Sequence, residues 1–325
     1  MAPVDETSPD ESAQAILAAA VGAARYAPSI HNTQPWLWQT ADARITLSAN
    51  PQRLLAASDP SGRMLRISCG ASLAYALAAI AAQGYEAVVS RFPDTEGSDM
   101  LATVEVGAPV GVSREHADWF TSVMRRRTDR RPLRAPAPTR KQVEAIQRAA
   151  EGEECRLQPL RADQVGRLAS MADTAFHLEA DDVDRQRELA EWVAVGDDAP
   201  GVPAATIPAA GGKYRVRPRF TSGSLTTGAG SDVAAAYLLL FTDTDDHLAW
   251  LRAGEAMVAA WVTANIEGLS VMPLSSVVEM AVTRLGLYQL LPGGGHPQLI
   301  LRVGHPDTTV EPPPTPRDRM VPVAT

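Results

Sequence analysis

The chain has 325 residues, 45% of them hydrophobic and 21% charged, which is the balance of a globular protein large enough for two domains. Its net charge of −8 argues against general affinity for nucleic acid or an anionic membrane, and its two distant cysteines fit a reducing compartment and no metal site. The acidic, polar start is no signal peptide, and the longest apolar run, residues 69–82, is too short to cross a bilayer. We therefore expect a cytoplasmic protein.

The first predicted element is an alanine-rich helix over about residues 11–27, which stops at Pro28. Five residues with hydrogen-bonding side chains follow before Pro35: Ser29, His31, Asn32, Thr33 and Gln34. A turn that faces solvent does not need so many residues with hydrogen-bonding side chains. The pattern predicts a rigid loop that presents polar groups to something flat and buried.

The remaining elements of the first part are a strand near 36–48, a Leu-rich segment, a buried helix from 69 and strands up to 106. The second part is expected to contain helices at 114–127 and 140–151, a strand at 155–161, helices over 163–194, a strand at 235–242, a buried helix at 247–267 and a strand at 298–304. Residues 196–230, here called the lid segment, are rich in Pro and Gly. Their apolar and aromatic residues favour an ordered segment that covers a site.

An internal repeat links the two parts. At one constant offset, residues 53–64 match 236–248 and residues 69–88 match 253–272, so that Gly70 falls on Gly254. Residues 102–109 match 299–306 at a different offset, which implies an insertion. Alanine- and leucine-rich helices that end in glycine can be alike by chance, but three matches in the same order favour duplication. We therefore expect two diverged α+β copies, over 1–112 and 113–325.

Arginines are concentrated in two places. Residues 124–134 hold six of them around Thr128, and the proline-rich stretch 312–320 holds Arg317 and Arg319. Guanidinium groups bind phosphate in a bidentate manner, although a solvated basic helix end is as good an interpretation of the first cluster alone. Neither stretch has the aromatic residues of a nucleic-acid patch.

Several motifs resemble those of one family. Pro28-Ser29-x-x-Asn32-x-Gln34-Pro35-Trp36 resembles the Pro-Ser-x-x-Asn-x-Gln-Pro-Trp motif of the FMN-dependent nitroreductases. Residues 126–130 resemble the arginine motif of that family, residues 265–276 its flavin-facing helix end, and residues 315–319 its C-terminal basic pair. The duplicated single chain resembles more closely the Acg-type nitroreductase-like proteins of actinobacteria.

The resemblance implies a nitroreductase-like fold in which one chain mimics the intertwined dimer of the family, so that a monomer acts as an internal pseudo-dimer. One FMN would lie between the copies, because residues 149–160 keep only Gln158-Pro159 of the loop motif. The residues implied to bind FMN are Pro28, Ser29, Asn32, Gln34, Arg126, Arg127, Thr128, Arg130, Pro273, Leu274, Ser275, Ser276, Arg317 and Arg319. No side chain is expected to be catalytic, because the flavin carries the chemistry.

The implied activity is an oxidoreductase that passes hydride from NAD(P)H through FMN to a nitroaromatic or quinone acceptor in a ping-pong reaction. The alternative is a catalytically weak protein that binds or stores FMN under the lid segment. Pro132 and the Ser275-Ser276 pair depart from the residues usual in the family. His31 is expected to be a neutral hydrogen-bonding residue rather than an acid, and Trp36 a core residue.

Overall fold

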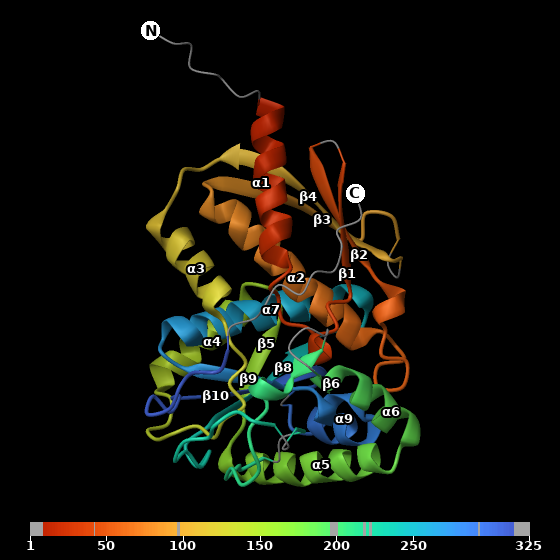
Figure 1. The fold of residues 1–325 in the computed structure, drawn as a ribbon. Coiled ribbons are helices and arrows are strands. Elements are labelled where there is room, and N and C mark those ends of the chain that lie inside the picture. The colour runs from red at the N-terminus through yellow and green to blue at the C-terminus, as the bar shows by residue number, and fades with distance from the viewer. Residues whose placement is uncertain are drawn as a thin grey trace.

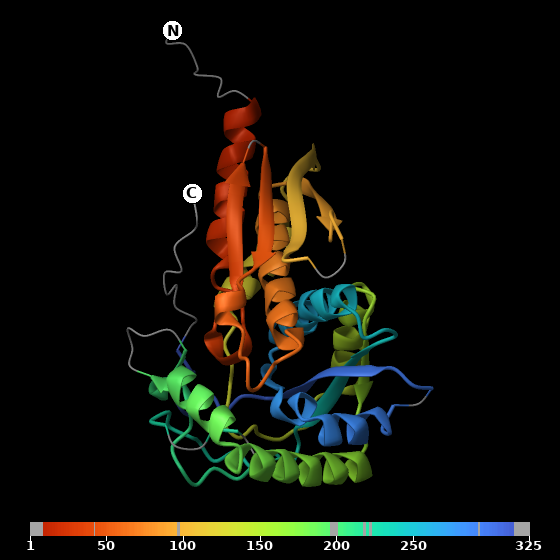
Figure 2. The same cartoon turned by 90° about the vertical axis from the view of Figure 1, so that its right-hand side faces the viewer.

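The computed structural model describes residues 9–41, 43–95, 98–195, 201–216, 219–220, 223–291 and 293–314. Its described residues form two four-stranded antiparallel sheets, each with a long apolar helix against it (Figures 1 and 2). The two long helices pack against each other in the middle of the molecule. The architecture is therefore α+β, with the main core where the two halves meet.

The first half has its strands in the order β1-β2-β4-β3. Its elements are α1 (Pro9–Ala24), β1 (Trp36–Ala41), β2 (Arg44–Ala49), α2 (Arg63–Ala82), β3 (Tyr85–Arg91) and β4 (Met100–Pro109). The single strand expected near 36–48 is wrong, because β1 and β2 form a hairpin in which Trp36 pairs with Ala49. The sequence from Ala41 to Arg44 contains no Gly, Pro or Asn, and its one turn-favouring residue, Asp42, is a weak signal by itself.

The second half repeats this plan with strand order β5-β8-β10-β9. Its main elements are α3 (Arg114–Arg125), α4 (Arg140–Glu151), β5 (Arg156–Pro159), α5 (Ala162–Ala180), α6 (Val183–Trp192), β8 (Ala236–Thr242), α7 (His247–Ile266), β9 (Ser270–Leu274) and β10 (His296–Gly304). Each half contains a helix, two strands, a long helix and two strands in that order. This shared topology confirms the internal duplication.

The two long helices, α2 and α7, cross at equivalent glycines. A Cβ atom on Gly70 would lie 1.9 Å from the carbonyl oxygen of Leu251, and one on Gly254 would lie 2.0 Å from that of Ile67. Ile67 and Leu251 are themselves matched by the repeat, so the contact is reciprocal, as in a two-fold arrangement. Only glycine allows the two backbones to approach this closely.

The structure corrects one repeat match and explains another. Leu238 lies in β8, whereas its proposed counterpart Leu54 follows a short 3-10 helix (Pro51–Arg53), so the match of 53–64 with 236–248 was wrong. The strand equivalent to β8 is β2, and the similarity was one of composition. The match of 102–109 with 299–306 is confirmed by β4 and β10. Helices α8 (Ser276–Glu279) and α9 (Ala281–Tyr288) are inserted before β10 and account for the shifted offset.

Helix α2 is longer than the apolar run that predicted it. Its 20 residues are enough to cross a membrane by length and composition, but 78% of its most apolar window is buried inside the protein. The helix packs against α7, α1 and α3, so its apolar surface is covered on several sides. It therefore serves as a core helix.

Candidate functional site

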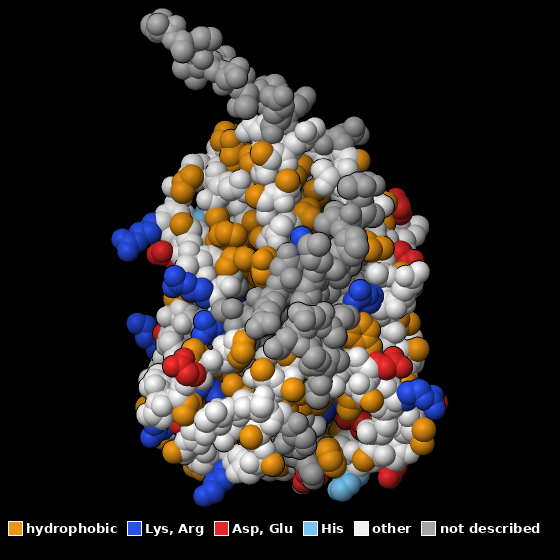
Figure 3. All heavy atoms as spheres, viewed as in Figure 1, with side chains coloured by type: hydrophobic (Ala, Val, Ile, Leu, Met, Phe, Trp, Pro, Cys, Tyr) orange, Lys and Arg blue, Asp and Glu red, His pale blue; other side chains and the backbone are white. Residues whose placement is uncertain are grey.

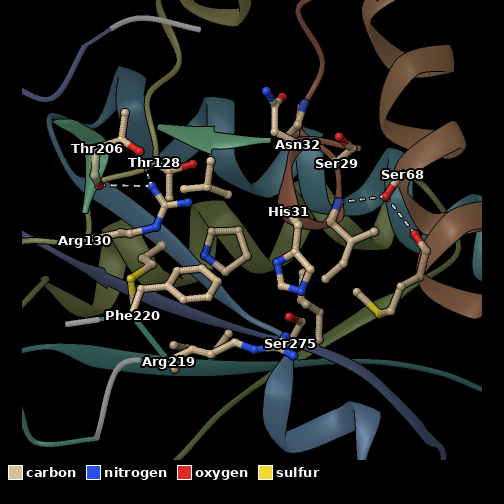
Figure 4. Close-up of a pocket in the computed structure, with 18 of the residues that line it drawn as sticks. Ser29, His31, Asn32, Ser68, Thr128, Arg130, Thr206, Arg219, Phe220 and Ser275 are labelled. Carbon is tan, nitrogen blue, oxygen red and sulfur yellow. Dashed lines mark hydrogen bonds between the residues drawn. The ribbon is translucent and has the colours of Figure 1, made fainter. Parts of the chain in front are cut away.

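A cavity of about 220 Å³ lies where the two halves meet (Figure 4). The first half contributes the loop 28–32 and part of α2, and the second contributes residues of 126–130, α7 and 272–276. Ten of the fourteen predicted site residues line it: Pro28, Ser29, Asn32, Arg126, Thr128, Arg130, Pro273, Leu274, Ser275 and Ser276. Neither half could form this cavity alone.

The loop after α1 is held in an unusual backbone conformation. His31, Asn32 and Gln34 have φ of 45°, 56° and 50°, in the left-handed region that costs a residue other than glycine about 1–3 kcal/mol. Two hydroxyls fix it: Ser68 Oγ on α2 accepts from Ile30 N at 3.0 Å, and Ser29 Oγ accepts from Gln34 N at 2.9 Å. Gln34 is buried outside the cavity and closes the loop through its backbone.

Arginines form one wall of the cavity. Arg126 is buried, its guanidinium lies 4.5 Å from the centre of the Trp261 ring, and its Nε donates to Tyr75 Oη at 2.7 Å. Its Nη1 is buried without a hydrogen-bond partner among the described residues. Arg130 donates through Nη1 to the carbonyl oxygen of Thr206 at 3.2 Å. Burial lowers the pKa of Arg130 to about 10, helped by the nearby positive charge of Arg126.

The arginines of the cluster do not all face the cavity. The chain is extended around Thr128, which forms a bridge with Val271, and side chains of an extended chain alternate between two sides. Arg126, Thr128 and Arg130 therefore line the cavity, and Arg127 does not. On the other side, Arg131 forms a buried ion pair with Asp129 at 2.7 Å.

The charge of this wall is not balanced by acidic residues. Among the described residues that line the cavity there is no Asp or Glu. A buried guanidinium with an unpartnered N–H is unfavourable unless an anion or a hydrogen-bond acceptor meets it. The wall is therefore suited to an anionic group such as a phosphate. The predicted contributors Arg317 and Arg319 lie outside the described residues.

Described parts of the lid segment lie against the cavity, which they line with six residues: Val202, Pro203, Ala205, Thr206, Arg219 and Phe220. Asn32 Nδ2 donates to the carbonyl oxygen of Gly201 at 2.9 Å. Arg219 is held by Glu179 of α5 and by Glu279 of α8, the latter at 3.0 Å. The segment is thus fixed to both halves of the protein.

Two side chains that the sequence did not assign to the site face each other in this cavity. The ring of Phe220 lies edge-on to His31 at 5.7 Å, between the guanidinium groups of Arg130 and Arg219, each 5.9 Å from its centre (Figure 4). His31 is 7% exposed, and burial holds its pKa well below the usual range, aided by the charges of Arg219 and Arg130. The proline-bounded loop and the aromatic residues of the lid segment were the available signals for them.

Fold and cavity together define a two-copy α+β protein with one cationic, aromatic-lined cavity between the copies. No family model matches the chain. The protein named Putative NAD(P)H nitroreductase Rv3131 of Mycobacterium tuberculosis is 36% identical over 298 residues, 90% of this chain and 86% of the relative. Putative NAD(P)H nitroreductase acg of the same organism is 29% identical over 308 residues, 93% of each chain. The chain therefore belongs to the nitroreductase family that these proteins represent.

Solved structures of nitroreductases are similar over part of the chain. One with bound FMN from Desulfitobacterium hafniense has a TM-score of 0.42 and 13% identity, and covers 64% of this chain and 98% of its own. One with bound FMN from Bacteroides fragilis has a TM-score of 0.41 and 11% identity, with the same coverage.

Proposed function

We propose that the chain is an FMN-dependent oxidoreductase that passes electrons from NAD(P)H to a nitroaromatic or quinone acceptor. Its relatives are known as NAD(P)H nitroreductases, which suggests the electron donor, and the solved nitroreductases that resemble part of the chain contain bound FMN. The observation that carries the proposal is the cationic wall of Arg126 and Arg130, in a cavity that no described Asp or Glu lines and that apolar, aromatic and uncharged polar residues complete.

The residues present fit FMN. Arg126, Thr128 and Arg130 would hold its phosphate, because two guanidinium groups and a hydroxyl offer several donors on one wall. Pro28, Ser29 and Asn32 would lie along the ring. A phosphate gripped in this way leaves no room for an adenylate, so FMN is expected rather than FAD.

When bound, FMN supplies the exchange of hydride between donor and acceptor. The chain binds it, orients it and keeps water from it. Residues 273–276 line the cavity at the end of β9 and would face the reactive side of the ring, where backbone N–H groups can donate hydrogen bonds. The strained loop, which the hydroxyls of Ser29 and Ser68 hold in place, fixes the side chain of Asn32 before the ligand arrives.

One cofactor per chain is expected. Ser275 and Arg91 stand at equivalent positions, each seven residues after a repeat glycine, Gly268 and Gly84. Arg91 instead binds the buried carboxylate of Glu255 through two hydrogen bonds of 3.0 and 2.7 Å. The position that lines the cavity in one copy therefore forms an ion pair in the other, which supports a single site.

The test is the affinity for FMN, measured by quenching of flavin fluorescence as the apoprotein is titrated. Arg130→Ala should weaken binding by about 2 kcal/mol, or roughly 30-fold, because charge-assisted hydrogen bonds in a water-poor site are lost. Arg140→Ala is the matched control, since that arginine is exposed on α4 and pairs only with Glu144. An unchanged dissociation constant in Arg130→Ala would contradict the assignment.

A second candidate function is storage of FMN under the lid segment. It is favoured by the bonds of Asn32 and Arg130 to backbone oxygens of that segment, which tie the presumed flavin-binding groups to the cover. Anaerobic mixing of the FMN-loaded protein with NADPH separates the two functions. Prompt bleaching of the flavin supports the oxidoreductase, and persistent colour supports storage.

A further inference from the structure

His31 has a nitrogen without a partner inside the cavity. The residue is 93% removed from solvent, its exposed fraction being 7%, and its Nε2 makes no hydrogen bond to any described residue. Buried polar atoms nearly always have partners, so such an atom in a cavity marks a place for a ligand. The backbone of His31 also adopts a φ of 45°, which is uncommon for a residue other than glycine.

The surroundings of His31 define the kind of atom that would meet it. Burial lowers the pKa of His31 well below its usual range, and the charges of Arg219 and Arg130 lower it further, so the neutral imidazole is favoured. The same positive charges attract electron-rich oxygen atoms of a ligand. Beside these arginines a neutral imidazole serves best as a hydrogen-bond donor, because a ligand oxygen can then satisfy both kinds of group at once.

His31 lies beside the lid segment as well as beside Arg130. Its ring packs against Phe220 of the lid segment, and Arg219, whose charge lowers the pKa of His31 more than that of Arg130 does, belongs to the same segment. Figure 4 shows the imidazole beside the ring of Phe220 on the wall of the cavity, which Ser275 also lines.

We propose that His31 Nε2 donates a hydrogen bond to an oxygen atom of the electron acceptor, a planar aromatic molecule with a carbonyl, nitro or carboxylate oxygen. The proposal rests on the oxidoreductase function above and adds a residue that selects the substrate. Phe220 supplies the aromatic surface next to it. A planar ring with an oxygen substituent is complementary to this pair, whereas an aliphatic acceptor is not.

The experiment measures binding of 4-nitrobenzoate to the oxidised, FMN-loaded protein through the change in flavin absorption. His31→Phe keeps a ring against Phe220 but removes the nitrogen, and should weaken binding by about tenfold, the usual effect of one lost buried hydrogen bond. His31→Gln keeps an N–H donor and should recover most of the affinity. His177→Gln, on the exposed side of α5, is the control and should bind as the wild type does.

The dissociation constant of FMN is measured for each variant in parallel. Unchanged FMN affinity together with weakened 4-nitrobenzoate binding in His31→Phe supports the proposal. Equal 4-nitrobenzoate affinity in His31→Phe and the wild type would overturn it, as would a loss confined to FMN affinity, which would place the nitrogen on the flavin. A wild-type chain that binds no FMN would instead overturn the proposed function.

Discussion

The crossing of α2 and α7 gives a quantitative prediction for Gly70→Ala. The new Cβ would lie 1.9 Å from the carbonyl oxygen of Leu251, so the backbones must separate by more than 1 Å to reach the 3.0 Å below which real contacts essentially never fall. Overpacking of a core costs about 1–3 kcal/mol, and the upper end applies because backbone cannot rotate away. Alanine is about 1 kcal/mol more favourable than glycine inside a helix, which offsets part of this cost. We expect the free energy of unfolding to fall by about 2 kcal/mol.

Urea denaturation followed by circular dichroism measures this change. Gly254→Ala should have a similar effect, because its Cβ would lie 2.0 Å from the carbonyl oxygen of Ile67. Gly166→Ala on α5 is the matched control, because nothing lies within 4 Å of its new Cβ. Its free energy of unfolding should rise by roughly 0.5–1 kcal/mol, since alanine has the higher helix propensity. If Gly70→Ala is as stable as the wild type, the close, reciprocal crossing of the two copies is wrong.

Three further predictions follow from the described contacts. Purified protein should contain one FMN per chain, and a measured content near two would contradict the single site expected from the ion pair of Arg91 with Glu255. Arg219→Ala should raise the rate of flavin reduction by NADPH and weaken FMN binding, because the lid segment loses its ion pairs with Glu179 and Glu279. Stopped-flow absorption measures the rate of reduction. An unchanged rate would argue against a lid. Burial raises the pKa of Asp59 to about 6. Its carboxyl therefore binds the proton more tightly in the folded state, and stability present below about pH 4 is lost as the pH rises through 6. Urea denaturation at several pH values measures this. The free energy of unfolding of the wild type should fall by about 2 kcal/mol relative to that of Asp59→Asn between about pH 4 and pH 7. If the free energies of unfolding of the two proteins change with pH in the same way, the prediction is refuted.

The sequence predicted the parts of the fold that depend on local pattern. Gly70 and Gly254 marked the repeat because a close backbone approach admits no other residue, and the apolar helices around them were visible as uninterrupted runs. The hairpin of β1 and β2 was missed because the sequence between the strands offers Asp42 as its one turn-favouring residue, without a Gly, Pro or Asn beside it. The Leu54 match failed because composition alone does not define a strand.

The same division holds for the site. The loop motif and the arginine cluster were found, but the sequence did not show which arginines face the cavity. The direction of each arginine depends on the extended backbone at Thr128. Arg126 and Arg130 lie on one side of it, and Arg131 lies on the other side, where it pairs with Asp129. The contact of His31 with Phe220 joins residues far apart in the chain, and only tertiary structure brings them together.

The composite cavity has a consequence for how the protein can change. When two identical subunits build a site, one substitution in the gene alters both walls of every copy of the site. Dilution can also dissociate the subunits and so separate the two walls. Here both walls belong to one polypeptide, so their effective concentration is set by the chain itself and does not fall on dilution. Arg91 could become a partner of Glu255 while Ser275, its counterpart, stayed beside the cavity. Because the two copies are joined in one chain, a residue in one copy can change while the equivalent residue in the other copy stays the same.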